Sequence, residues 1–133
     1  NCRFKESLWR KSVFLDSKAV GSCFIRALFR DAAITGCDFR YANLDGMLWD
    51  GCEVRASSFK EAVLSGVKFR RALFHETDLS AADFFKSSLK GIDLSDCSID
   101  AIAVSDTLAE LRGAKVNAAQ AVELAKLIGL SIV

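Results

Sequence analysis

Large apolar side chains recur at every fifth residue of this 133-residue chain, in one register from Phe4 to Val104. Ala19 is the only small residue in the series. An amphipathic helix repeats its apolar positions about every 3.6 residues and a half-buried strand every second residue, so a period of five matches neither element. The period instead indicates a solenoid of short stacked repeats.

A second series confirms the register. Two positions before each large residue stands a residue that is usually Ser, Ala or Cys, which gives alternating large and small inward positions. Glycine falls two positions after a large residue, where we expect a corner that favours positive φ. These glycines are Gly21, Gly36, Gly46, Gly51, Gly66 and Gly91. Proline is absent, so no backbone donor is lost from the stack.

Residues 41–46 (YANLDG), 80–84 (SAADF) and 109–113 (AELRG) match an A(D/N)LXX-like unit. In this respect the chain resembles the pentapeptide-repeat family. The resemblance implies an all-β solenoid, a right-handed quadrilateral β-helix with four repeats per coil, over residues 1–116. We expect residues 117–133 to form a separate C-terminal capping α-helix and tail.

The register slips once, after Val104. The next unit centres on Leu111, seven residues further on, so we expect residues 105–108 to bulge outward by two extra residues. A helical pattern then begins, in which Asn117 and Gln120 predict a capping box. Gly129 can end the helix in a left-handed turn, so the predicted helix spans residues 118–128.

The predicted helix is apolar around most of its circumference. One face should cover the open end of the solenoid core. The apolar arc exceeds what one cap needs, so we expect the rest, with the tail, to form a homodimer; the alternative is that helix and tail both fold back as a monomeric cap. The expected dimer residues are Val122, Leu124, Leu127, Ile128, Leu130 and Ile132.

Residues 111–116 (LRGAKV), Gln120-Ala121 and residues 127–130 (LIGL) resemble the C-terminal end of the Qnr and MfpA quinolone-resistance proteins. The resemblance implies dimerisation through this segment. It also implies binding to a type II topoisomerase, DNA gyrase or topoisomerase IV, by a rod that imitates DNA. The register between Phe4 and Val104 has no interruption that could hold a projecting loop, which is more like MfpA than Qnr.

Charge departs from that expectation, because DNA mimics are typically acidic and this chain has a formal net charge of +1. When the repeats are assigned in rotation to four faces, one face has five carboxylates against the single cation Arg55. We call it the acidic face; its carboxylates are Asp16, Glu53, Glu76, Asp93 and Asp96. The neighbouring face is basic, with a cluster of Lys68, Arg70, Arg71 and Lys90. The acidic face could replace a phosphate backbone at a topoisomerase, or both faces could be ordinary solvated surface.

Leu8, Leu28 and Leu48 are twenty residues apart and should stack as an outward aliphatic strip. Such a strip marks either a partner contact or a surface covered by further N-terminal residues. The alternative function is therefore a dimeric interaction scaffold with another protein partner. Direct nucleic-acid binding is not expected, because the basic cluster lacks exposed aromatics and no helix could enter a groove.

Catalytic, metal and membrane signals are weak. His75 points outward beside Glu76 with no nucleophile nearby, so we do not expect an enzyme or a cofactor. Cysteine and histidine spacing predicts no metal site. No apolar run approaches the roughly 20 residues that span a bilayer, so no membrane association is expected. Cys2, Cys37, Cys52 and Cys97 fall in the inward column as reduced thiols, which favours the cytoplasm.

Overall fold

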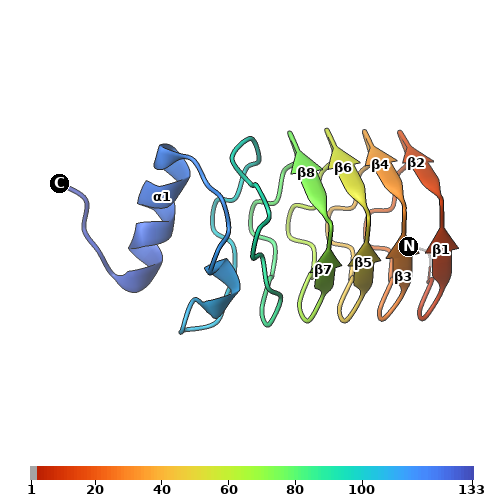
Figure 1. Cartoon of the computed structure of the whole chain (residues 1–133), viewed down its shortest axis with the longest axis horizontal. Coiled ribbons are helices and arrows are strands. Elements are labelled where there is room, and N and C mark those ends of the chain that lie inside the picture. Colours follow the sequence, from red (N-terminus) through yellow and green to blue (C-terminus); the bar gives the residue numbers. More distant parts are fainter. Residues whose placement is uncertain (1–2) are drawn as a thin grey trace.

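The computed structural model describes residues 3–133, so the predicted inward position of Cys2 lies outside the described residues. Within that range two parallel sheets, ordered β1-β3-β5-β7 and β2-β4-β6-β8, run along the molecule (Figure 1). Every strand is three residues long. The strands are β1 (Leu8–Arg10), β2 (Val13–Leu15), β3 (Leu28–Arg30), β4 (Ala33–Thr35), β5 (Leu48–Asp50), β6 (Glu53–Arg55), β7 (Lys68–Arg70) and β8 (Leu73–His75).

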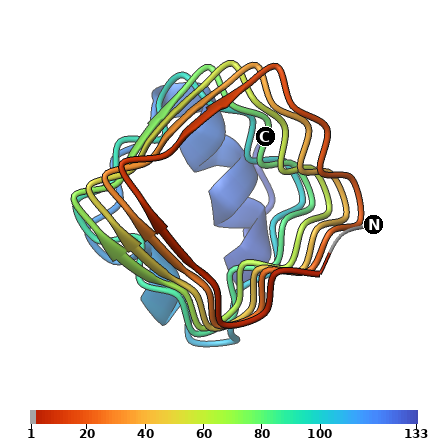
Figure 2. The same cartoon turned by 90° about the vertical axis from the view of Figure 1, so that its right-hand side faces the viewer.

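Each regular coil contains twenty residues and has four sides. Trp9 is paired with Phe29 and Phe29 with Trp49, so equivalent positions stack at intervals of twenty. The two sides without strands are joined by single parallel bridges, such as Asp38 to Ser58. Viewed along its axis, the solenoid has the quadrilateral outline predicted from the repeat (Figure 2). The predicted β-helix of pentapeptide repeats is confirmed.

The fifth-residue series fills the inside of the coil. Trp49 is fully buried and stacks on Phe29 and Phe74, with ring centroids 5.9 and 5.7 Å apart. Phe39 and Phe59 lie almost parallel, 4.9 Å apart. Buried small residues such as Ala42 and Cys52 occupy the second series. The alternation of large and small residues therefore gives a solid core without interior space for a ligand.

Positive φ is a property of the corners rather than of glycine. The six predicted corner glycines have φ between 62° and 79°. Corners without glycine adopt the same conformation, for example Arg26 at 56°, Tyr41 at 61° and Ala56 at 49°. Because a left-handed conformation costs a residue with Cβ about 1–2 kcal/mol, the backbone ladder must hold these corners in place.

The predicted two-residue insertion is confirmed. Bridges join residues twenty apart as far as Asp83 and Ala103, but Asp93 is bridged to Lys115, which lies twenty-two residues on. The extra residues form a turn that leads into a short 3₁₀ helix, η1 (Ala109–Leu111). The last coil thus regains its stacking after the insertion.

The C-terminal helix closes the end of the solenoid, where it lies across the opening (Figure 2). It comprises α1 (Ala118–Ala125) followed by the 3₁₀ turn η2 (Lys126–Ile128), and Gly129 ends it with φ 83°. The predicted capping box is present: the N–H of Gln120 donates to Asn117 Oδ1, and the N–H of Asn117 donates to Gln120 Oε1, both at 2.8 Å. The predicted helix is confirmed, except that its last turn is 3₁₀.

Gln120 also ties this helix to the last coils. Its side chain is 8% exposed, and Nε2 donates to the carbonyls of Leu94 and Cys97 at 2.6 and 2.7 Å. Leu124, on the same side of α1, packs against the core cluster. One amide group therefore starts the helix and attaches it to the solenoid.

Gln120→Met should destabilise the chain by about 2 kcal/mol, because it removes the donor to two buried carbonyls while keeping the length of the side chain. Urea unfolding followed by circular dichroism measures the loss. Ala119→Met, at an exposed position of the same helix, is the control and should change stability by less than about 0.5 kcal/mol. Equal effects of the two variants would show that the amide does not hold the helix.

Candidate functional site

The acidic face lies over the sheet β2-β4-β6-β8 and is uneven along the rod. Glu76 and Asp96 occupy equivalent positions twenty residues apart, and Asp93 lies on the same side of the coil as Asp96. Asp16 stands alone in the first coil, because the second coil has Gly36 at the equivalent corner. The carboxylates therefore gather in the fourth and fifth coils rather than forming a continuous row.

Three carboxylates of the acidic face have partners within the chain. Glu53 pairs with Arg55 on the same strand. Asp96 Oδ2 lies 3.6 Å from Nδ1 of His75. Asp93 Oδ1 accepts the N–H of Ser95 at 2.9 Å, and hydrogen bonding from Ser95 holds the pKa of Asp93 below its ordinary value. Glu76 and Asp16 take part in no ion pair among residues 3–133.

The basic face divides into a paired part and an unpaired part. Arg71 Nη2 donates to Asp50 Oδ1 at 2.6 Å, and this hydrogen bond holds the pKa of Asp50 below its ordinary value. Arg30 also approaches Asp50, at 3.9 Å. Within the described residues, the cations without an ion pair on this side of the fourth and fifth coils are Lys68, Arg70, Lys86 and Lys90. Of the predicted basic cluster, Arg71 is thus paired, and Lys86 lies with the remaining three as a further cation without an ion pair.

The aliphatic strip is stacked as predicted, since Leu8 pairs with Leu28 and Leu28 with Leu48. Only Leu8 is strongly exposed, at 53%, while Leu28 and Leu48 are half-buried. The strip ends at Lys68, the equivalent position of the next coil. Its exposed apolar surface is therefore confined to the first coil.

The six residues predicted for a dimer contact fall into two groups. Leu124 lies against the solenoid core and is half-buried, so it belongs to the cap. The other five are exposed, by 40% to 60% of their side-chain surface. They are Val122, Leu127, Ile128, Leu130 and Ile132.

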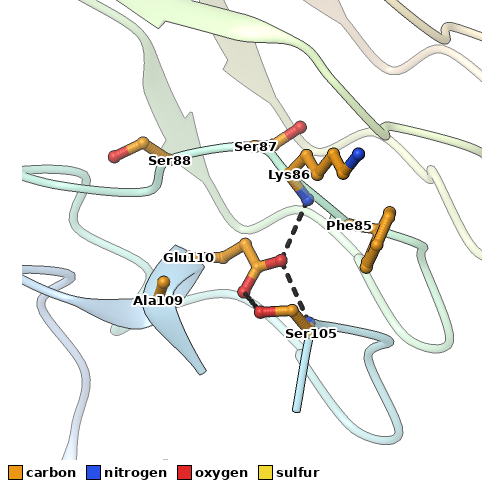
Figure 3. A pocket seen from close by; sticks show the side chains of 7 residues that line it. All are labelled: Phe85, Lys86, Ser87, Ser88, Ser105, Ala109 and Glu110. Atoms are coloured by element: carbon orange, nitrogen blue, oxygen red, sulfur yellow. Dashed lines mark hydrogen bonds between the residues drawn. The ribbon is translucent and has the colours of Figure 1, made fainter. Parts of the chain in front are cut away.

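The two-residue insertion creates a hollow in the surface, which we call the notch (Figure 3). Its volume is about 270 Å³, and it is lined by Phe85, Lys86, Ser87, Ser88, Ser105, Ala109 and Glu110. The side chain of Glu110 enters from η1 and is only 4% exposed. Its Oε2 accepts the N–H groups of Lys86 and Ser105 at 2.9 and 3.0 Å, and Oε1 accepts the Ser105 hydroxyl at 2.8 Å.

These donors decide the protonation state of Glu110. Burial alone would raise the pKa of its carboxyl, but the N–H and O–H donors stabilise the charged form more strongly, so the pKa lies below its ordinary value. The Glu110 carboxylate thus accepts hydrogen bonds from backbone N–H groups of Lys86 and Ser105 at the point where the insertion interrupts the hydrogen-bond ladder between coils. The residue was not among the candidates from sequence; the register slip at Val104 was the one signal that pointed to this region.

The notch overturns one expectation about the basic cluster. Phe85 is 44% exposed, and the ammonium of Lys86 lies 5.3 Å from its ring centroid. A second hollow of about 380 Å³ shares Lys86 and Ser88 with the notch and is also lined by Lys68, Arg70 and Lys90. The prediction that no exposed aromatic accompanies the cluster is therefore wrong, because Phe85 occupies an outward position beside the corner.

Sites for other chemistry are not evident in the described part of the chain. Residues 3–133 contain no group of three or more His, Cys, Asp or Glu that could hold a metal ion. Among the same residues no helix is long and apolar enough to cross a bilayer. Cys23, Cys37, Cys52 and Cys97 are free thiols, and burial raises the pKa of Cys97 to about 11.

A comparison with models of protein families identifies the repeat. A model of pentapeptide repeats matches residues 37–75 and 62–99, with eight copies of the repeat. The chain belongs to the pentapeptide-repeat family. No curated protein sequence matches it.

Several solved structures of pentapeptide-repeat proteins are similar to this chain. One from the Arabidopsis thaliana thylakoid lumen has a TM-score of 0.68 at 18% identity, over 93% of this chain and 74% of that one. A trypsin-treated form of QnrB1, a plasmid-mediated fluoroquinolone resistance protein, has a TM-score of 0.44 at 15% identity, over 99% of this chain and 94% of that one. HetL from Nostoc sp., involved in heterocyst differentiation regulation, has a TM-score of 0.24 at 13% identity, with 86% of each chain covered. At these identities the first likeness establishes the fold alone.

Glu110→Gln should make folding stability less sensitive to acid. A carboxyl whose folded pKa lies below its ordinary 4.5 contributes stability that is present above that value and lost as the pH falls further. The glutamine variant cannot titrate, so its stability should fall less steeply than that of the unaltered chain at acid pH. Denaturant unfolding across the acid range measures both slopes.

Ser105→Ala provides the complementary variant, because it removes only the hydroxyl donor to Glu110 Oε1. The folded pKa should then rise toward its ordinary value, so the loss of stability on acidification should be smaller than in the unaltered chain and should be complete at a higher pH. Identical pH profiles for all three proteins would mean that the hydrogen bonds to Glu110 do not set its charge.

Proposed function

We propose that this pentapeptide-repeat protein binds a type II topoisomerase, DNA gyrase or topoisomerase IV, in place of DNA and thereby protects it from fluoroquinolone-type poisons. The observation that carries the proposal is the grouping of Glu76, Asp93 and Asp96 on one side of the fourth and fifth coils. These exposed carboxylates would face the basic surface that a topoisomerase offers to phosphates. The C-terminal resemblance to Qnr and MfpA proteins supports the same choice.

The core supports this proposal by making the rod stiff. A mimic must present its charges in a fixed arrangement, because ordering them on binding would cost affinity. Trp49 and Phe59 are fully buried within continuous ring contacts, and each coil is hydrogen-bonded to the next. The positions of the corner carboxylates are therefore set by the backbone before any partner arrives.

Pairing on the neighbouring basic face lowers its positive charge at the corner next to the acidic face. A basic face beside the acidic one would be repelled by a DNA-binding surface. Arg71, at the corner between the two faces, is paired with Asp50 and lies 4.0 Å from Asp31. The positive charge closest to the acidic face is thus largely compensated within the chain.

The protein would act by binding rather than by catalysis, as a homodimer in the cytoplasm. The exposed apolar residues of the helix and tail supply the dimer contact, because a monomer would leave them in water. Free buried thiols suit a reducing compartment. The alternative proposal is a dimeric scaffold for another protein partner, which would use surfaces other than the acidic face.

A supercoiling assay with DNA gyrase and ciprofloxacin tests the topoisomerase proposal. The protein should restore supercoiling in the presence of the drug. Glu76→Lys combined with Asp96→Lys should raise the concentration needed about tenfold or more, because like charges would then face each other. Asp93 is left unchanged, since its carboxylate also holds the N–H of Ser95.

Asp100→Lys combined with Asp106→Lys makes the same charge change at exposed positions outside the acidic face and is the control. It should act like the unaltered chain. No rescue by the folded unaltered protein would refute the topoisomerase proposal and leave the scaffold. An equal loss of supercoiling rescue in both double variants would show that rescue depends on the total charge of the protein and not on the acidic face.

Sedimentation velocity tests the dimer. The unaltered chain should sediment as a dimer, and Ile128→Asp combined with Leu130→Asp should give monomers, because both side chains are more than half exposed and would become charged in the contact. Leu124 is unsuitable for this purpose, since it packs on the core. A monomeric unaltered chain would contradict the proposal.

A further inference from the structure

The notch and the adjoining hollow form one continuous binding surface on the side of the basic face that lies away from the acidic face. They share Lys86 and Ser88, so an extended ligand could cross from one to the other. The notch is the apolar part, with the Phe85 ring and Ala109 in its wall. The adjoining hollow is the charged part, with Lys68, Arg70 and Lys90 around it.

The cations of this surface form no ion pair within residues 3–133, although Arg70 is close enough to Asp50 to help lower the pKa of that carboxyl. None of the four lysine and arginine side chains named above takes part in an ion pair among residues 3–133. The nearby carboxylate of Glu110 is buried and accepts three hydrogen bonds, so it does not reach Lys86 Nζ as a counter-ion. The surface is therefore complementary to a negatively charged ligand.

We propose that this surface binds an acidic segment of another protein, in which one apolar side chain enters the notch beside Phe85 and flanking carboxylates contact Lys68, Arg70, Lys86 and Lys90. The volume of about 270 Å³ suits a single side chain better than a complete small-molecule ligand, whose pockets measure roughly 300–1,000 Å³. Arg70 adds a planar group that can hold a carboxylate with two hydrogen bonds.

A single-stranded nucleic acid fits the same surface less well. Proteins that bind single strands offer a row of aromatic rings on which successive bases stack. Phe85 is the one exposed aromatic residue in the lining of the two hollows, as far as residues 3–133 are concerned. The ammonium of Lys86 lies over its ring, where a base would have to stack.

The surface is separate from the one proposed for a topoisomerase, and either could exist without the other. Its residues derive from the basic face and from the insertion after Val104, whereas the acidic face lies around the next corner of the coil. The insertion and the 3₁₀ turn that follows it contribute Ser105, Ala109 and Glu110 to the lining of the notch. A local departure from the repeat thus provides the specific part of the surface, and the stacked cations provide the charge.

Fluorescence anisotropy tests the proposal with a short labelled peptide in which one leucine is flanked by glutamates. The peptide should bind the unaltered protein, and affinity should fall with added salt. Replacing the leucine by alanine, or the glutamates by glutamine, should each weaken binding about tenfold. A labelled thymidine oligonucleotide of similar length should bind more weakly than the acidic peptide.

Protein variants locate the contact. Lys68→Glu combined with Lys90→Glu should weaken binding of the acidic peptide about tenfold or more, whereas Lys18→Glu combined with Lys60→Glu, an equal charge change on another face, should alter it by less than about twofold. Phe85→Ala should weaken binding of the leucine peptide. It should hardly weaken binding of the peptide in which alanine replaces the leucine, because the two changes remove the same contact.

Three results would overturn the proposal: no binding of the acidic peptide to the folded protein, equal weakening by the two double charge variants, or tighter binding of the oligonucleotide than of the peptide. The last of these would instead indicate a nucleic-acid surface. Because the assay contains no topoisomerase and leaves Glu76 and Asp96 unchanged, its failure would say nothing about the acidic face.

Discussion

The hydrogen-bond ladder between successive coils is the constraint on which the other features depend. The N–H of Phe39 donates to the carbonyl of Ser58 and that of Leu44 to the carbonyl of Val63, and this pattern places like positions twenty residues apart. Stacked aromatic rings, small inward residues and left-handed corners are all consequences, because each must repeat wherever the ladder repeats. Corner residues such as Arg26 accept positive φ since leaving that conformation would break the ladder on both sides.

The same ladder organises the charges on the outside. Arg30 stacks against Asp50, and Arg71 closes over Asp50 from the neighbouring coil, so opposite charges are paired where the register is regular. Where the register changes, after Val104, the pairing pattern ends and Glu110 turns inward to serve the backbone. Lys68, Arg70, Lys86 and Lys90 of the fourth and fifth coils form no ion pair within residues 3–133.

The sequence predicted the coil, the insertion, the capping box and the stacking of Leu8 on Leu28, because all of these follow from spacing along the chain. It did not predict the role of Glu110. At that position of a regular repeat the side chain points outward. The burial of the Glu110 side chain depends on hydrogen bonds from the N–H groups of Lys86 and Ser105, which the period of five does not predict. Similarly, the pairing of Arg71 and the exposure of Phe85 depend on how individual side chains turn at a corner. Spacing determines which face a residue occupies, but not which neighbour its side chain meets.

A solid core also limits how such a protein can act. Trp49 and its buried neighbours fill the inside of the described coils with side chains. Function must therefore come from outward side chains, and two adjacent sides of one rod can serve different partners because the rigid core keeps them independent. The interruption of the repeat nevertheless adds a surface feature, because Ser105 and Glu110 line the notch. The insertion at residues 105–108 is such an interruption, and it lies beside unpaired cations and an exposed aromatic ring.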